Sequence, residues 1–210
     1  MGLQHRLTLL VAAVMLVIVF PFSAGAKASD TLLADVISLK LGIGNYVIGE
    51  QLNAVQKKNA LQHPVEGAYE GTYKFVDNDL YIVVDSTTDR VLALYKRNKE
   101  AGKKQLKEMV VELMGLFGAP TTMAHDKILY WAFNRHGAVS EEDFNRAKEA
   151  KQTPGLGIIA TVKLNSEMEI TPDPVEEEQA AAEKTPAATG TIYFILTSDP
   201  LVKEFMAARQ

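Results

Sequence analysis

The residues that could perform acid–base or metal chemistry are few, and their spacing assembles no known site. Beyond the N-terminal segment the chain has three histidines, His63, His125 and His136, which form neither an HxxxH pair nor an HExxH motif. A hydrolase would have to combine His125 and His136 with Asp126 and Glu141, and nothing in this spacing selects a catalytic triad. We therefore predict that the protein is not an enzyme and holds no metal or cofactor.

Two acidic segments resemble the start of a calcium-binding loop. Asp77-Asn78-Asp79 and Asp85-x-Thr87-x-Asp89 carry side-chain oxygens at alternating positions. An EF-hand loop also needs glycine at position six and glutamate at position twelve, where the second segment has Arg90 and Lys96. Both segments are therefore predicted to be turns whose side chains are satisfied locally.

The composition excludes several classes of site and partner. The 210 residues contain no cysteine, so the chain has no thiol nucleophile, thiolate zinc site, disulfide or cysteine-linked lipid anchor. Its net charge of −4 argues against a generally basic surface that would bind nucleic acid.

Aromatic side chains on predicted strands are the strongest signal for binding. Successive strand residues point to opposite faces, yet segments such as Leu80–Val84 and Ile128–Phe133 are apolar at successive positions. Helices cover one face of a two-layer domain, so the second face is either ordinary core in a curled sheet or a binding surface. Ordinary core is the plain interpretation, and the functional alternative is a concave aromatic binding face, because tyrosine and tryptophan are good interface anchors. Its candidate residues are Tyr73, Phe75, Tyr81, Tyr95, Trp131, Phe133 and Tyr193.

A basic cluster is the second candidate surface, and Glu100 is its only internal counter-charge. A solvated face is the plain interpretation of such a cluster. The functional alternatives are contact with anionic lipid head groups or peptidoglycan carboxylates, and docking with an acidic segment of the same chain. The cluster consists of Lys96, Arg97, Lys99, Lys103, Lys104 and Lys107.

The elements that must position these side chains follow one order twice: a helix and then three strands. The first copy is predicted as a helix over 48–59 and strands over 69–76, 80–85 and 90–96. The second is predicted as a helix over 102–117 and strands over 127–134, 157–165 and 190–197, with a helix over 141–150 inserted and a final helix running through Arg209. We therefore expect an α+β fold with two layers, built from tandem helix-plus-antiparallel-sheet units over 27–100 and 101–210.

One local pattern resembles a known family. Phe117-Gly118-Ala119-Pro120 ends a predicted helix that contains Val110 and Leu113, and Tyr130-Trp131 follows on a predicted strand. This arrangement resembles the V-x-x-L-h-G-x-P…W-x-Y pattern of SmpA/OmlA-type domains, which belong to small outer-membrane assembly lipoproteins. It is also similar to the β-lactamase-inhibitor-protein-like fold, with two such units in tandem. The aromatic order is reversed here and the lipid-attachment cysteine is absent. The resemblance implies a non-catalytic protein-binding module.

The first 26 residues are typical of a secretory signal peptide. His5 and Arg6 precede the predominantly apolar stretch Leu7–Phe20, and Ala24-Gly25-Ala26 fits the small-x-small cleavage rule. Ala26-Lys27-Ala28 offers a second cleavage register. An uncleaved anchor is the alternative, but crossing the hydrocarbon core takes about 20 apolar residues. We expect a periplasmic or secreted protein after cleavage near Ala26.

The negative charge of the chain is concentrated in the segment Glu167–Gly190. This Pro/Ala/Glu-rich stretch has seven acidic residues and one lysine. Such a composition is typical of a solvated loop, and an acidic tether for a basic partner or for divalent cations is the alternative.

The preferred function is therefore a non-catalytic protein-interaction module of the cell envelope, with an envelope protein as its partner. A homodimer through the second sheet face is a further option for the partner. The alternative function is a periplasmic small-ligand binder or sensor that uses the cleft between the two units.

Overall fold

The computed structural model describes residues 24–170 and 189–209. The helices are α1 (Ala24–Ser38), α2 (Ala54–Gln62), α3 (Lys103–Phe117), α4 (Glu141–Glu149) and α6 (Asp199–Ala207), with the 3₁₀ helix η1 (Thr153–Leu156). The strands are β1 (Gly42–Ile43), β2 (Tyr46–Val47), β3 (Thr72–Asp77), β4 (Leu80–Asp85), β5 (Val91–Gly102), β6 (Thr122–Ala124), β7 (Ile128–Asn134), β8 (Gly137–Ala138), β9 (Ala160–Ser166) and β10 (Thr189–Thr197). Within these ranges no helix is both long and apolar enough to cross a membrane.

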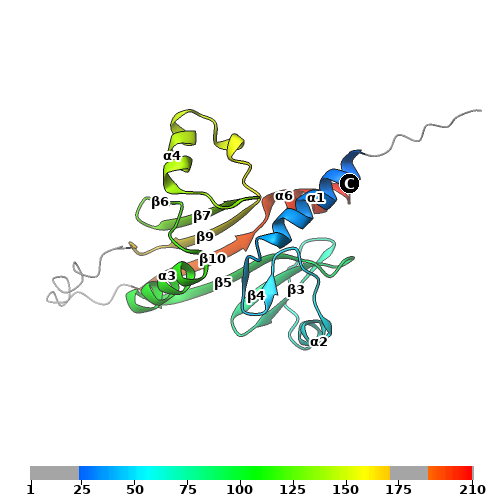
Figure 1. Cartoon of the computed structure of the whole chain (residues 1–210). Helices are drawn as coiled ribbons and strands as arrows, with labels where there is room; N and C mark the ends of the chain where they lie inside the picture. The colour runs from blue at the N-terminus through cyan, green and yellow to red at the C-terminus, as the bar shows by residue number, and fades with distance from the viewer. Residues whose placement is uncertain (1–23, 171–188, 210) are drawn as a thin grey trace, which may run out of the picture.

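One antiparallel sheet organises the molecule. Its strand order is β3-β4-β5-β10-β9-β7-β6, with β8 paired to β7, and β1 and β2 form a separate two-stranded sheet. The predicted α+β class is confirmed. Strands from the first and second halves of the chain meet at the pairing of β5 with β10, which runs from Thr189 opposite Gly102 to Thr197 opposite Ala93 (Figure 1). The predicted unit boundary at residue 100 falls inside β5, and the two sets of strands share one sheet.

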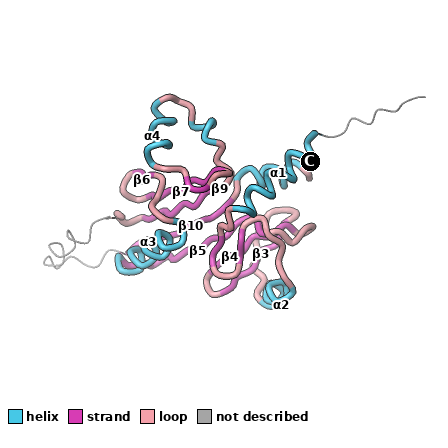
Figure 2. The backbone as a smooth tube through the Cα atoms, in the orientation of Figure 1, coloured by secondary structure: helices cyan, strands magenta, loops and turns pink. Residues whose placement is uncertain are grey.

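Helices α1 and α3 pack against one face of this sheet (Figures 1 and 2). Val36 of α1 and Leu113 of α3 belong to the same buried cluster as Ile82, Leu94 and Phe194 of the central strands. Burying a side chain of this size contributes about 1.5–3 kcal/mol. The cluster therefore holds both helices onto both halves of the sheet.

The end of α3 explains the Gly-x-Pro…Trp pattern physically. Gly118 has φ 78° and ψ −162°, and its N–H donates to the carbonyl oxygen of Met114. This backbone region is essentially restricted to glycine. The indole Nε1–H of Trp131, on β7, donates to the carbonyl oxygen of Gly118 at 2.9 Å. The residues of the pattern therefore hold the end of the helix against the sheet.

One predicted helix is misplaced, and one helix of the structure was not predicted. The helix expected over 48–59 begins only at Ala54. Gly49 has a positive φ of 84°, and the N–H of Gly49 donates to Val91 and that of Leu52 to Asp89, which holds this segment outside the helix. A capping box between Asn53 and Gln56 then starts α2. Helix α1 was not predicted.

Helix α6 is fastened to a turn of the sheet through Arg209. Nη2 of Arg209 lies 2.6 Å from Oδ1 of Asp85, and the Arg209 guanidinium lies 3.7 Å from the ring centroid of Phe205. Burial raises the pKa of Asp85, but hydrogen bonds from Thr87, Thr88 and Arg209 outweigh it and hold the pKa below its usual value. The carboxylate is thus charged at neutral pH and ties α6 to the β4–β5 turn.

Gly115 inside α3 and Gly118 at its C-cap should respond in opposite ways to the same substitution. No atom lies within 4 Å of a Cβ built on Gly118 or on Gly115, so only the backbone conformation distinguishes them. Gly118→Ala should lower the free energy of unfolding by about 1–3 kcal/mol, since it forces alanine into a glycine-only region. Gly115→Ala, inside the helix, should raise it by about 0.5–1 kcal/mol.

Chemical denaturation of both variants provides the measurement, with Gly115→Ala as the matched control. Equal effects of the two substitutions would contradict the role assigned to Gly118.

Candidate functional site

The face of the sheet turned away from α1 and α3, here called the open face, carries two rows of side chains across neighbouring strands. The register places the members of each row directly opposite one another. All of them are exposed or half-buried, and α4 reaches only the end of the first row, where Phe144 lies 6.0 Å from Tyr130 between ring centroids. The first row is Tyr81, Tyr95, Ile195, Lys163 and Tyr130, and the second is Arg97, Tyr193, Asn165 and Ile128.

The predicted aromatic face is divided between the two sides of the sheet. Tyr81, Tyr95 and Tyr193 lie on the open face as expected. The prediction is wrong for the four others, which point toward the helices: Phe75, Trp131 and Phe133 are core residues with at most 5% exposure, and Tyr73 packs against the core. The cause is the two-residue alternation of strands, because each of these four residues is in register with a buried neighbour.

Two stacked tyrosines form the apolar centre of the first row. Tyr81 and Tyr95 are opposite each other on β4 and β5, with ring centroids 4.7 Å apart and ring planes 8° apart. Such pairs contribute about 0.5–1.5 kcal/mol beyond the area they bury. Burial, with a smaller contribution from Tyr81, raises the pKa of Tyr95, so its hydroxyl is neutral and can both donate and accept.

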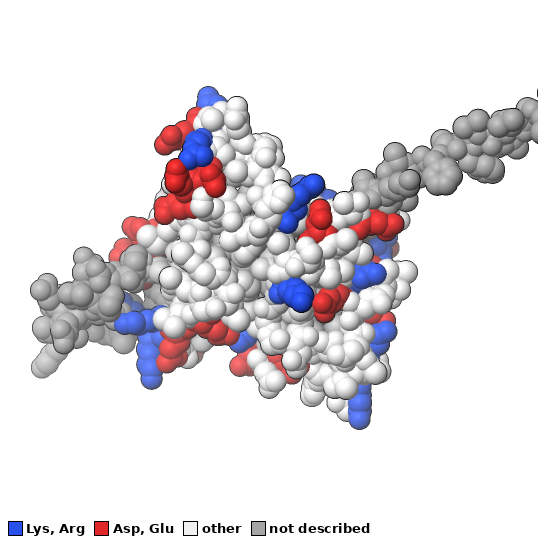
Figure 3. Space-filling view, viewed as in Figure 1, with Lys and Arg blue, Asp and Glu red and all other residues white. Residues whose placement is uncertain are grey.

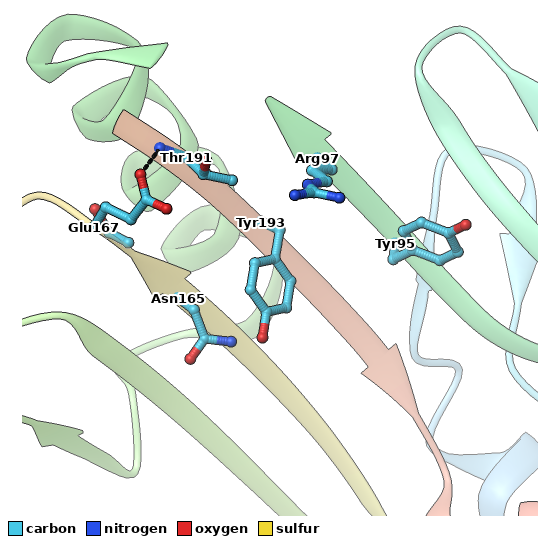
Figure 4. A pocket seen from close by; sticks show the side chains of 7 residues that line it. Tyr95, Arg97, Asn165, Glu167, Thr191 and Tyr193 are labelled. Carbon is cyan, nitrogen blue, oxygen red and sulfur yellow. Dashed lines mark hydrogen bonds between the residues drawn. The ribbon is translucent and has the colours of Figure 1, made fainter. Parts of the chain in front are cut away.

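A pocket with a volume of about 380 Å³ lies beside this stack (Figure 4). Strand β10 runs through its middle, with β5 on one side and β9 on the other. Tyr193, which is 41% exposed, stands between Arg97 and Glu167 in Figure 4. The lining residues are Tyr95, Arg97, Asn165, Ser166, Glu167, Thr191 and Tyr193.

The polar groups of the pocket are incompletely used within the described chain. The guanidinium of Arg97 makes no hydrogen bond or ion pair with any described residue, and the side-chain nitrogen of Asn165 is buried without a partner. Glu167 is held in place, because its Oε2 accepts from the backbone N–H of Thr191 at 2.7 Å. Buried unpartnered donors cost free energy and call for an explanation. With respect to the described residues, the pocket thus presents a free cation, a free donor and a fixed carboxylate.

The predicted basic cluster is separated in space. Lys96 and Arg97 are consecutive on β5 and point to opposite faces, and Lys96 lies 3.9 Å from Glu112 of α3. Lys104 pairs with Glu108 on the same helix at 3.8 Å. Lys99 and Lys103 are exposed, as is Lys107. On the helix-covered side, Figure 3 shows basic and acidic residues interspersed among wide uncharged areas. Only Arg97 of this cluster joins the pocket.

The residues considered for hydrolysis do not meet. His125 and Asp126 form the turn before β7, and His136 follows its other end, which places them about 20 Å apart along a strand of this length. Glu141 starts α4 beyond His136. Across residues 24–170 and 189–209, no group of three or more His, Cys, Asp or Glu side chains could hold a metal ion.

The acidic turns use their carboxylates within the fold. Asp77 accepts from the hydroxyl of Tyr46 at 2.9 Å, and Asp89 accepts from Tyr73 at 2.8 Å and pairs with Lys57 at 2.6 Å. The expected local hydrogen bonds are present in part, from Asn78 to Asp77 and from Thr87 and Thr88 to Asp85. The two partners of Asp89 named above instead come from distant elements.

The acidic segment is shorter than predicted. Met168 and Ile170 are buried, and Thr189 and Gly190 belong to β10. The remainder of the segment, 171–188, lies outside the described residues. Sequence reasoning therefore missed Glu167 as a pocket residue by including it in the loop. The alternation Thr161-x-Lys163-x-Asn165, polar on one face of β9, was the available signal for Asn165.

Comparison of the chain with family models, with curated protein sequences and with solved structures finds no match in any of the three. The geometry of the open face and its pocket therefore provides the argument about function.

Asn165→Val should raise the free energy of unfolding by about 1 kcal/mol, because it removes a buried donor that has no partner among residues 24–170 and 189–209. The matched control is Asn134→Val at the end of β7, where Oδ1 accepts from the N–H of His136 at 2.8 Å. In that variant the free energy of unfolding should fall by about 1 kcal/mol, because the substitution removes an existing hydrogen bond. Thermal denaturation of the two variants is the measurement, and a loss of stability in Asn165→Val would show that the amide has a structural partner.

Proposed function

We propose that this protein is a non-catalytic binding module of the bacterial cell envelope and that the open face is its binding surface for a protein partner. The observation that carries the proposal is a row of four half-buried side chains and one exposed lysine, which crosses five strands without a described helix above it beyond α4 at its end. The row is Tyr81, Tyr95, Ile195, Lys163 and Tyr130. Large aromatic side chains with a polar tip are the residues most enriched at binding hot spots. A contiguous apolar row rimmed by charges is typical of an interaction site.

The resemblance to SmpA/OmlA-type domains supports the architecture more than the partner. Gly118 and Trp131, the two best-defined residues of the pattern, meet in a hydrogen bond that ends α3. Their role in this chain is structural, so the proposed partner rests on the open face and not on the pattern.

An envelope location follows in this proposal from the N-terminal segment. Cleavage after Ala26 would remove the first three residues of α1, whose described core contacts come later, from Leu32, Leu33 and Val36. The folded body therefore retains its packing after processing.

The processed protein should begin at Lys27, or at Ser29 if the second register is used. Intact-mass measurement of the protein purified from the periplasmic fraction of a bacterial host provides the test. A protein that retains Met1 and sediments with membranes would instead support the uncleaved anchor.

A photo-reactive residue should detect the protein partner at the open face. We expect p-benzoylphenylalanine at Tyr81 or Tyr193 to give a cross-linked adduct in cells that naturally produce the protein. Tyr69, which is 79% exposed and lies outside the sheet, is the matched control and should give none. Adducts at Tyr69 alone, or at none of the three positions, would contradict the assignment of the open face.

The pocket favours a second candidate function, the binding of a small ligand. Its volume and its mixture of aromatic and polar lining residues are those of a ligand site.

A further inference from the structure

The pocket on the open face has opposite charges at its two ends. Arg97 comes from β5, and Glu167 follows the end of β9, while Tyr193 of β10 stands between them (Figure 4). Neighbouring strands are about 4.8 Å apart, so β5 and β9 lie about 10 Å apart across β10. A ligand that touches both charges must therefore carry its own charged groups at a separation of several carbon atoms.

Each end of the pocket specifies a ligand group. The Arg97 guanidinium, which has no partner among the described residues, offers a planar fork of donors that matches a carboxylate. At the other end, the hydrogen bond from Thr191 fixes Glu167 through Oε2, and Oε1 makes no hydrogen bond to any described residue. A carboxylate oriented in this way favours a cationic group such as an ammonium.

The middle of the pocket specifies an apolar spacer. The rings of Tyr95 and Tyr193 line it, and an aromatic face packs against methylene groups and attracts a nearby ammonium. The unpartnered nitrogen of Asn165 offers one further donor on the same row as Arg97 and Tyr193.

We infer that this pocket binds a zwitterion whose carboxylate meets Arg97, whose ammonium meets Glu167 and whose apolar spacer lies on Tyr193. A C-terminal lysine of a protein partner has this chemistry, as does a free ω-amino acid. The inference rests on the proposed function for the position of the site, since the pocket lies on the open face, and it specifies the group of the partner that enters the pocket.

Three probes with the same spacer separate the two charges: 6-aminohexanoate, hexanoate and hexylamine. NMR titration of the full chain gives the Kd of each, and the backbone amides of Tyr95, Thr191 and Tyr193 report whether binding occurs in the pocket. The zwitterion should bind about fivefold more tightly than either single-charge probe, as each exposed ion pair contributes up to about 1 kcal/mol.

Two variants should each remove the contribution of one ion pair to the tighter binding of 6-aminohexanoate. In Arg97→Gln, 6-aminohexanoate should bind no better than hexylamine. In Glu167→Gln, which keeps an oxygen acceptor for Thr191, it should bind no better than hexanoate. Lys99→Gln and Glu169→Gln remove exposed charges two residues away that do not line the pocket, and they should keep the wild-type order.

Nα-acetyl-lysine distinguishes the two sources of the ligand. Binding as tight as that of 6-aminohexanoate supports a C-terminal lysine of a partner, and much weaker binding supports a free ω-amino acid. Three results would overturn the inference. The first is equal affinity for all three spacer probes, and the second is no shift of the pocket amides at millimolar concentrations. The third is tighter binding of glucuronate, an anion without an ammonium group, than of 6-aminohexanoate. None of these results alters the cross-linking outcome at Tyr81, so the inference and the proposed function fail separately.

Discussion

The pairing of β10 with β5 and β9 is the constraint on which the rest of the structure depends. Residues opposite one another on paired strands share a face, and the face changes at every residue. The register of β10 therefore decides that Ile192, Phe194 and Leu196 enter the core, and that Tyr193 and Ile195 do not. A shift of one residue would place Tyr193 under α3 and expose Phe194. The core and the binding surface are thus two results of one set of backbone hydrogen bonds.

Local signals predicted the elements whose determinants lie within a few residues. Strand β4 has the predicted bounds, and α3 was predicted to within one residue, since Gly118 and Pro120 mark its end. The segment before α2 was misassigned for the opposite reason. Leu52 and Val55 suggested a helical face, whereas hydrogen bonds from Gly49 to Val91 and from Leu52 to Asp89, about 40 residues later, hold residues 49–52 outside the helix. The α+β class could be predicted, but the joining of both strand sets into one sheet depends on such long-range pairing.

The candidate site could be predicted only in part, for the same reason. Tyr81, Tyr95 and Tyr193 were identified by residue type, and so was Arg97 as part of a basic cluster. Assigning Phe75 and Trp131 to the helix side required the register, because both strands are apolar on successive residues. Asn165 ends a polar alternation on one face of β9, and Glu167 was counted with the acidic loop, but neither local pattern indicates a pocket. They become pocket residues only because β9 lies beside β10, and their neighbours Leu164 and Met168 are buried on the opposite side.

The central position of β10 also imposes an order on folding. Residues 189–197 come later in the chain than both of their partners, β5 and β9, so each of these strands has an unpaired edge until β10 is available. Unpaired edges readily join other chains, and contacts this distant in sequence form slowly. The two halves can collapse separately but become one sheet only when β10 enters between them. A chain that crosses a membrane in extended form, N-terminus first, would bring β10 across after both of its partners, so the sheet closes only when nearly all of the described chain has been delivered.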